Sequence, residues 1–392
     1  MFICNGRVVS MESDPILCGF VEITDKKIGR IGPMEEFPGT PEDTVWDAGG
    51  GWILPGFVDA HTHLGLFEDA LGFEGEDGNE DTDPILPQLR VIDGINPMER
   101  SFRESLCAGV TACLVYPGSC NPIGGQIAAI KTCGRRIDDM ILRAPCAVKF
   151  ALGENPKSCY NEKEESPVTR MATASLIRDT LMRAQEYKTR KQHAEDPSDA
   201  PDYDSKFEAL IPVLDRSCQA HFHAHRADDI FTALRIAKEF QLDAVIIHGT
   251  EAHLVADILT EEPGIRICAG PCLTDRSKPE LANLSEASPK LLTDAGIPTA
   301  LITDHPETPL KHILHCALSA VKAGMEPMQA LRAITIVPAE IAGIADRVGS
   351  IKTGKDADLV VFSGDPLEYR STITAVFADG TCITGGTTNA YN

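Results

Sequence analysis

The sequence predicts an α/β protein with a (β/α)8 TIM barrel and a small β-sandwich domain. Two observations support this prediction. Residues 1–55 and 345–392 contain short runs of β-branched residues separated by Gly, Pro and Asp, which is typical of strands joined by turns. Residues 56–344 alternate apolar strand-like runs with helix-like stretches, which is typical of a barrel. We therefore expect both ends of the chain to form the β-sandwich and the middle to form a barrel inserted between them.

The barrel prediction rests on apolar runs that are bounded by turn residues. They are residues 51–61, 109–118, 124–132, 144–153, 218–225, 242–250, 265–272 and 297–305. A doubly wound open sheet is the alternative for such an alternating pattern. However, no G-x-G-x-x-G follows the first run, so the barrel is favoured.

Helix-like stretches lie between many of these runs. Residues 226–242 place Ile230, Leu234 and Ala237 on one face, the pattern of an amphipathic helix that packs on a sheet. A charged insertion at about 158–205 interrupts the alternation. Its centre has the composition of a helix, and its tail has the composition of a solvated loop.

Composition limits the partners that this chain can have. The formal net charge is -22, which argues against nucleic acid or an anionic membrane as a partner. The first twenty residues lack the pattern of a signal peptide, and no apolar run approaches the length of a membrane span. The 13 cysteines are scattered and contain no C-x-x-C pair, which suits buried thiols in a reducing compartment. We therefore expect a cytoplasmic protein, and we expect a homo-oligomer.

Polar residues gather at the ends of the predicted barrel strands, where a barrel carries its reactive side chains. They are His61 and His63 in the first run, Lys149 in the fourth, His221, His223 and His225 in the fifth, His248 in the sixth and Asp304 in the eighth. Residues i and i+2 of a strand point to the same face, so the first two imidazoles lie side by side. Each residue alone has an ordinary structural explanation. Together they favour one metal site at the mouth of the barrel.

Three sequence motifs resemble those of one known family. "ILPGFVDAHTH" at 53–63, "ITDHP" at 302–306 and "TIVPAEIAGIADRVGSIKTGKDADLVVFSGDPL" at 335–367 are similar to the first strand, the eighth strand and the final helix-to-sheet path of the amidohydrolase superfamily. The likeness is greatest to its imidazolonepropionase- and prolidase-like metal-dependent hydrolases. It covers nearly the whole chain and implies a barrel plus a β-sandwich.

The resemblance implies a ligand set for a divalent metal. The expected ligands are His61, His63, Lys149, His223, His248 and Asp304. His225 is the alternative to His223, and His221 is the least favoured of the three. Asp304 is also expected to be catalytic, because the eighth-strand aspartate of the family touches the metal and transfers the proton. The ligand types suit one or two zinc ions, with manganese, iron or nickel as alternatives.

Lys149 needs a separate explanation, because an ammonium group cannot bind a cation. In binuclear members of the family, carbon dioxide carboxylates the fourth-strand lysine, and the resulting carbamate bridges two metals. The apolar surroundings of Lys149 favour the neutral amine that this reaction needs. Two alternatives stay open: Glu154 bridges the metals directly, or Lys149 binds substrate beside a single metal.

The expected activity is metal-dependent hydrolysis of a C–N amide bond in a small molecule such as a dipeptide, an N-acyl compound or a cyclic amide. Deamination is an alternative, although Arg226 stands where deaminase-like relatives carry an acid. A non-catalytic scaffold is a further alternative. The candidates for binding substrate are His225, Arg226, Asn121, Gln126, Glu154 and His305.

Overall fold

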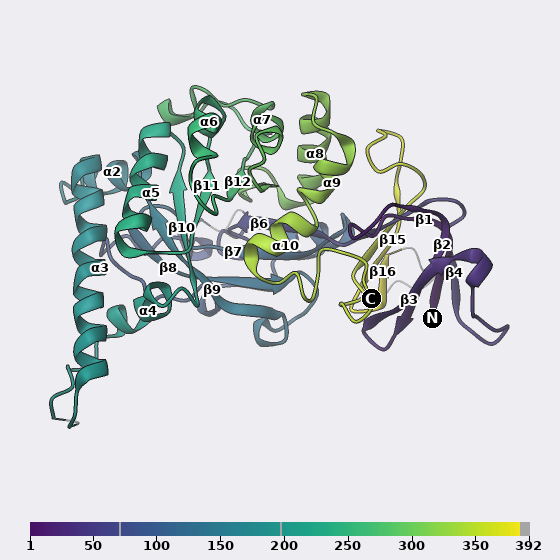
Figure 1. The fold of residues 1–392 in the computed structure, drawn as a ribbon, viewed down its shortest axis with the longest axis horizontal. Helices are drawn as coiled ribbons and strands as arrows, with labels where there is room; N and C mark the ends of the chain where they lie inside the picture. The colour runs from purple at the N-terminus through teal and green to yellow at the C-terminus, as the bar shows by residue number, and fades with distance from the viewer. Residues whose placement is uncertain (70–71, 197, 385–392) are drawn as a thin grey trace.

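The computed structural model describes residues 1–69, 72–196 and 198–384, and its strands form two eight-stranded sheets (Figure 1). The predicted β-rich segment at the C-terminus therefore lies within the described residues only as far as residue 384. The first sheet comes from the two ends of the chain and the second from its middle. Together with the helices, they make a mixed α/β fold.

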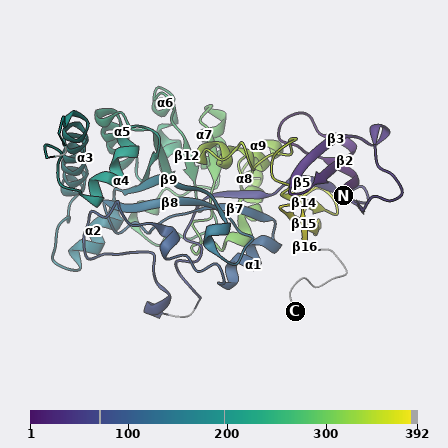
Figure 2. The same ribbon diagram turned by 90° about the horizontal axis from the view of Figure 1, so that it is seen from below.

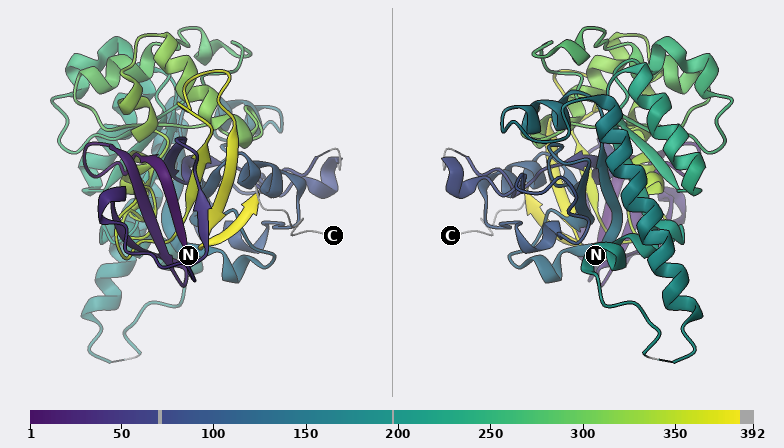
Figure 3. Two further views of the ribbon diagram at one scale, coloured as in Figure 1. Left: turned by 90° about the vertical axis from the view of Figure 1, so that its right-hand side faces the viewer. Right: turned by 90° about the vertical axis from the view of Figure 1, so that its left-hand side faces the viewer.

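The first sheet joins the two ends of the chain. Its strands are β1 (Phe2–Val8), β2 (Ile16–Thr24), β3 (Lys27–Pro33), β4 (Val45–Asp47), β5 (Trp52–Pro55), β14 (Leu359–Phe362), β15 (Ile373–Ala378) and β16 (Thr381–Thr384). Their order is β16-β15-β14-β5-β1-β2-β3, and β4 pairs with β1. Antiparallel pairing of β5 with β14 brings N-terminal and C-terminal segments side by side (Figure 3). These strands form one continuous sheet, and the arrangement as a sandwich stays a prediction.

The second sheet contains one strand from each of the eight predicted runs. The strands are β6 (Phe57–Thr62), β7 (Val110–Val115), β8 (Ile123–Lys131), β9 (Ile141–Ala151), β10 (Gln219–Ala224), β11 (Ala244–His248), β12 (Ile267–Ala269) and β13 (Thr299–Leu301), in consecutive order across the sheet. Its two edges approach each other. The Asp304 amide donates to the His61 carbonyl at 3.1 Å, and the His63 amide donates to the His305 carbonyl at 2.9 Å. The sheet is therefore a nearly closed barrel.

One strand of the barrel runs against the others. β8 pairs antiparallel with both β7 and β9, whereas the predicted barrel has parallel strands. The reason lies in the connections, which are residues 116–122 and 132–140. A parallel return needs a crossover of roughly a dozen residues or more, usually a helix, and these segments are too short for one.

The helices cover the barrel sheet and extend the molecule. They are α1 (Arg100–Cys107), α2 (Glu154–Asn161), α3 (Arg170–His193), α4 (Ser205–Leu214), α5 (Ala227–Phe240), α6 (Ala256–Leu259), α7 (Ser288–Asp294), α8 (Ile313–Lys322), α9 (Pro327–Arg332) and α10 (Ile336–Ala342). α5 buries the predicted face of Ile230, Leu234 and Ala237. α3 is the helix expected inside the charged insertion, and it stands at the end of the molecule far from the first sheet (Figure 2).

The state of the cysteines agrees with the prediction of buried thiols. All 13 cysteines are free, and Cys113, Cys146 and Cys268 are buried in the strands, as predicted. Across the residues that the structure describes, none of the helices combines the length and the apolar character needed to cross a membrane.

Candidate metal centre

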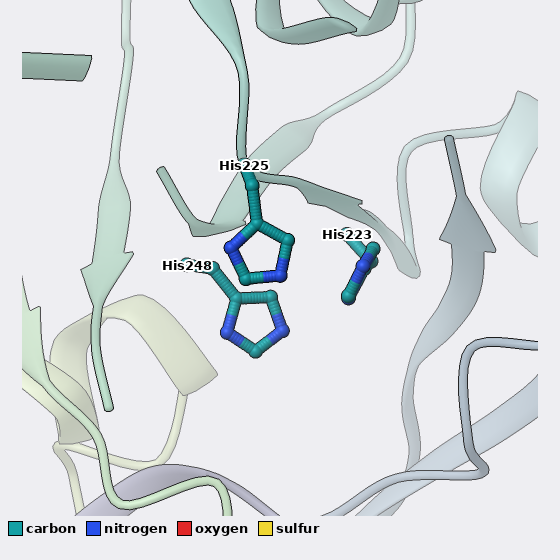
Figure 4. A group of neighbouring side chains, drawn as sticks. All are labelled: His223, His225 and His248. Carbon is teal, nitrogen blue, oxygen red and sulfur yellow. The ribbon is translucent and has the colours of Figure 1, made fainter. Parts of the chain in front are cut away.

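The candidate ligands meet at one end of the barrel in two groups. One group is His61, His63 and Asp304, and the other is His223, His225 and His248. Within each group, the atoms that could bind a metal all lie within 4.8 Å of one another. Figure 4 shows that the three imidazoles of the second group converge on one region. Strand ends separated by more than 240 residues of chain thus supply a single centre.

The first group is organised around one carboxylate oxygen. Oδ1 of Asp304 lies 3.0 Å from Nε2 of His61 and 3.4 Å from Nε2 of His63. Nδ1 of His63 lies 2.8 Å from the Tyr116 carbonyl oxygen. A carbonyl can only accept, so Nδ1 carries the proton and Nε2 keeps its lone pair toward Asp304.

The imidazoles of the second group are also oriented by contacts at their Nδ1 atoms. Nδ1 of His248 donates to the Gly270 carbonyl at 2.8 Å, which leaves its Nε2 as the ligand atom. Hydroxyl groups lie against the other two Nδ1 atoms, with Ser119 Oγ 3.0 Å from His223 and Thr250 Oγ1 2.7 Å from His225. The His225 and His248 rings stack with centroids 4.5 Å apart. Figure 4 shows these two rings next to each other.

The two groups adjoin each other. The ring centroids of His61 and His248 are 5.1 Å apart, and Nδ1 of His248 lies 4.0 Å from Oδ2 of Asp304. Among the described residues, several nitrogens in this region are buried without a hydrogen-bond partner: both ring nitrogens of His61, Nε2 of His223 and Nζ of Lys149. Burying a polar atom without a partner costs about 1–3 kcal/mol, so a cluster of them fits residues that hold a cation.

The imidazoles have the protonation state that metal binding needs. Burial lowers the pKa of His61, His223 and His225 well below the usual value for histidine. Burial also lowers the pKa of His248 to about 4. These side chains are therefore neutral at pH 7, and a neutral imidazole is the form that binds a metal ion.

Lys149 lies in β9, next to the strand that carries His223. Its side chain is fully buried, and its Nζ lies 5.1 Å from the centre of the Tyr116 ring. Its charge influences His61 in the first group and His223 and His248 in the second. Burial lowers the pKa of Lys149 to about 7, so a large fraction of this amine is neutral near physiological pH.

The backbone is strained at two candidate ligands. His248 has φ 72° and Asp304 has φ 54°, in the left-handed region that residues other than glycine rarely adopt. Such conformations persist only where surrounding contacts impose them, and they gather at functional sites. His248 is the last residue of β11, and Asp304 lies three residues after the end of β13.

Asp59 supports the first group and was missed by the sequence reasoning. Its buried carboxylate accepts hydrogen bonds from the His61 amide at 2.9 Å, the Thr303 amide at 3.0 Å and the Thr303 hydroxyl at 2.6 Å. These bonds tie β6 to the segment that carries Asp304. Burial raises the pKa of Asp59 to about 7. The alternation Asp59, His61, His63 would have placed it on the same strand face.

His221 has an ordinary structural role. Its Nδ1 lies 2.5 Å from the Tyr116 hydroxyl and its Nε2 lies 2.9 Å from Oε1 of Gln219. Both ring nitrogens are engaged, so neither is available to a metal. This agrees with its low rank in the sequence prediction.

A cavity of about 430 Å³ opens onto both groups. It is lined by His63, Phe67, Asn79, Gly118, Ser119, Asn155, His223, His225, His248, Pro271, Thr274, Ser277, Lys278, Leu281, Asp304, Pro306 and Glu307. Of the residues predicted to bind substrate, His225 is in this set. The other five lie elsewhere.

Those five residues have other contacts. Arg226 is exposed and pairs with Asp228 at 2.9 Å. Gln126 lines a separate small pocket, and His305 accepts a hydrogen bond from the Leu310 amide. Asn121 Nδ2 donates to the Glu80 carbonyl. Glu154 contacts Glu280 through its backbone amide, which donates a hydrogen bond to the Glu280 carboxylate.

Two residues of the centre come from a segment without a strand. Lys278 lines the cavity, and the buried Glu280 places its Oε1 3.6 Å from Nε2 of His225. Residues 270–281 follow β12 as a loop that ends in a short 3-10 helix, Pro279–Leu281, so the strand-end pattern gives no signal for either residue. Only the folded chain brings them to the histidines.

Comparisons with known proteins agree with this geometry. The profile described as the amidohydrolase family matches residues 52–387. The amidohydrolase tasK of Hapsidospora irregularis is 31% identical over 366 residues, which are 87% of this chain and 37% of that protein. This chain therefore spans only 37% of the length of that relative. The imidazolonepropionase of Geobacillus kaustophilus (strain HTA426) is 25% identical over 389 residues, covering 88% of this chain and 84% of that protein.

A solved structure is similar over nearly the whole chain. The crystal structure of an amidohydrolase from Thermotoga maritima MSB8 has 40% sequence identity and a TM-score of 0.93. The match covers 97% of this chain and 99% of that one. Fold and sequence therefore lead to the same group of proteins.

Proposed function

The chain belongs to the amidohydrolase family and is a hydrolase of carbon–nitrogen bonds, and from that premise we propose that it cleaves an amide bond with the help of bound divalent metal. The proposed substrates are small molecules: a dipeptide, an N-acyl compound or a cyclic amide. The observation that carries the proposal is the cluster of buried, unpartnered nitrogens between two groups of candidate ligands.

We assign one cation to His61, His63 and Asp304 and a second to His223, His225 and His248. The short separations within each group and the free Nε2 atoms support this assignment. Three imidazoles, or two imidazoles and a carboxylate, suit zinc, with manganese, iron or nickel as alternatives. The sequence left His223 and His225 as rivals, and we propose that both contribute.

Divalent metal in such a site lowers the pKa of water to about 7 and polarises the scissile carbonyl. Asp304 then has two tasks. Its carboxylate accepts the proton of the attacking water and returns it to the leaving nitrogen, so that the amine departs neutral. Asp304 Oδ1 lies 3.0 Å from Nε2 of His61 and 3.4 Å from Nε2 of His63, and Oδ2 lies 4.0 Å from the His248 ring, so this carboxylate is close to residues of both groups.

We propose further that Lys149 is carboxylated. Its nitrogen would bond to the carbon of carbon dioxide and lose one proton, which leaves an anionic carbamate between the two groups. Complete burial, the lack of a hydrogen-bond partner and the lowered pKa support this step, because only the neutral amine is nucleophilic.

Metal analysis of the purified protein tests the proposal directly. We expect one or two equivalents of transition metal per chain, and loss of amide hydrolysis after chelation with recovery on adding zinc. Dipeptides, N-acyl amino acids and cyclic ureides or imides form the substrate panel. Ammonia release from amino-substituted rings would favour the deaminase alternative. A chain that binds no stoichiometric metal would contradict the hydrolase mechanism and favour a scaffold.

A further inference from the structure

The cavity wall carries a single basic side chain. Among the described residues that line the cavity, Lys278 is the one lysine or arginine. Arg226 is the one arginine or lysine among the six side chains that the sequence predicts to bind substrate. However, Arg226 is not among the residues that line the cavity, and it pairs with Asp228 on the surface. The cationic group available to a ligand in the cavity is therefore Lys278.

Lys278 is held in place by two contacts. Its Nζ donates to Oδ1 of Asn155 at 2.9 Å and lies 2.8 Å from Oε1 of Glu280. The side chain of Glu280 is 1% exposed and does not line the cavity, so this carboxylate lies behind the ammonium group. An ammonium has three N–H donors. Two of them are engaged by the protein, which leaves one for a ligand.

The segment that carries Lys278 is fastened to the start of α2. Oε2 of Glu280 accepts a hydrogen bond from the Glu154 amide at 3.0 Å. Gly153 permits this approach, because its φ is 85° and a Cβ there would lie 2.9 Å from the same oxygen. The position of Lys278 is thus set before a ligand arrives, which reduces the entropic cost of binding.

Lys278 is close to the second group of candidate ligands. Its Nζ and Nε2 of His225 flank the same oxygen of Glu280, at 2.8 Å and 3.6 Å. Its charge also influences His223, His225 and His248. A small molecule that presents its scissile bond to the histidines therefore reaches Lys278 with a group only a few bonds away.

We infer that Lys278 binds a carboxylate next to the scissile amide. The substrates are then N-acyl α-amino acids or dipeptides, and in a dipeptide the C-terminal residue carries this carboxylate. In these compounds, three bonds separate the scissile carbonyl carbon from the carboxylate carbon, which matches the short span between histidines and ammonium. The pairing of an ammonium with a carboxylate is a charge-assisted hydrogen bond. This inference rests on the proposed function and assigns a specificity-determining residue to it.

Matched substrate pairs test the inference. Each N-acetyl amino acid and dipeptide is assayed beside its C-terminal carboxamide, which has the same shape but no charge. The metal-loaded wild type should prefer the acid by roughly tenfold or more, mainly through a lower KM. Lys278→Met should remove this preference, and Lys278→Arg should restore part of it. Lys290→Met, which removes a lysine paired with Asp294 on α7, is the matched control and should behave as wild type.

Each remaining result contradicts a particular claim. Hydrolysis of acid and carboxamide at equal rates, or an unchanged preference in Lys278→Met, would overturn the role of Lys278 and leave the hydrolase proposal standing. Loss of the preference in Arg226→Met with none in Lys278→Met would restore the expectation from the sequence. If the metal-loaded wild type hydrolyses neither form of any pair, the proposed function fails, and this inference fails with it. Equal metal content and circular dichroism in all variants confirm that folding is intact.

Discussion

Two lysines on neighbouring strands of the barrel show what pairing does to a buried charge. Lys131 in β8 and Lys149 in β9 are both buried. Nζ of Lys131 lies 2.6 Å from Asp358, 2.9 Å from Asp379 and 3.1 Å from Asp356. Nζ of Lys149 has no hydrogen-bond partner at all among the described residues.

The surroundings drive the two pKa values apart. Burial alone would lower the pKa of Lys131, but the nearby aspartates, Asp358 foremost, raise it to about 12. Burial is not opposed in this way at Lys149, and the pKa falls to about 7. A paired buried lysine is fixed as a cation and holds structure together, whereas an unpaired one is kept as a reactive amine.

The location of each lysine fits this division. The aspartates around Lys131 belong to the segments that enter β14 and leave β15, so this ion cluster joins the barrel to the sheet formed by the chain ends. Lys149 instead lies on β9, which pairs with the strand that carries the candidate ligand His223. A buried lysine thus joins two sheets at Lys131, whereas at Lys149 it provides an amine near the candidate metal ligands.

Replacing Lys131 should have the largest effect on stability. Lys131→Met leaves Asp356 and Asp358 buried without their partner, and breaking a buried ion pair in this way costs about 3–5 kcal/mol. Urea unfolding monitored by circular dichroism measures the loss. Lys290→Met removes only a surface pair and should change stability by about 0.5 kcal/mol or less. A Lys131→Met protein as stable as the wild type would show that the ion cluster does not hold the two sheets together.

Replacing Lys149 should separate activity from stability. Lys149→Met should lower kcat/KM by about 10²–10³-fold, the order of loss seen when one group that stabilises the transition state is removed. The free energy of unfolding of the metal-free protein should stay the same or rise, because an unpaired amine is no longer buried. Steady-state kinetics and urea unfolding of the same preparation measure both. Full activity in this variant would remove Lys149 from the mechanism, and a large loss of stability would make it a structural residue like Lys131.

The two lysines should give opposite dependences of stability on pH in protein stripped of metal and carbon dioxide. The folded pKa of Lys131 is above its unfolded value of about 10.4, so its contribution is present below that pH and is lost as pH rises through about 12. The folded pKa of Lys149 is lowered to about 7, so stability rises with pH between about 7 and 10.4, by at most about 1.4 kcal/mol per pH unit.

Variants test each slope separately. Urea titrations from pH 7 to pH 10 should show a shallower rise in Lys149→Met than in wild type. Titrations above pH 10 should show a smaller loss in Lys131→Met. Identical slopes in wild type and Lys149→Met would mean that Lys149 stays protonated inside the barrel, which would contradict a neutral amine ready for carboxylation.

The sequence was sufficient for the features that depend on local pattern. Apolar runs predict the eight barrel strands. The polar residues at the ends of these runs include His61, His63, His223, His248 and Asp304, which the structure brings together in two groups, and their role as ligands stays a prediction. The antiparallel direction of β8 follows from the short connections on either side of it, and the pattern of apolar runs alone does not show this. Lys278 and Glu280 could not be predicted, because they lie on a loop whose path is set by contacts with α2. Substrate-binding side chains come mainly from such loops, and this explains why five of the six candidates are not among the residues that line the cavity.

The smallest predicted effect concerns support behind the first group of ligands. Asp59→Asn keeps the shape of the side chain but replaces one acceptor oxygen with an N–H group. That N–H group would face a donor of Thr303 or His61, whose hydrogen bonds the Asp59 carboxylate now accepts. Both His61 and Asp304 should then shift, and loss of such indirect support typically lowers metal affinity or activity by about 10–100-fold.

Thr303→Val is the graded control for Asp59→Asn, because it removes only one of the three donors. Its effect on metal affinity should be smaller than that of Asp59→Asn, as measured by competition with a chelator of known affinity. An Asp59→Asn protein that binds metal as tightly as the wild type would show that β6 and the Asp304 segment are aligned by backbone pairing alone. The Asp59 carboxylate would then resemble the Lys131 cluster, as a buried charge that contributes to the fold and not to the centre.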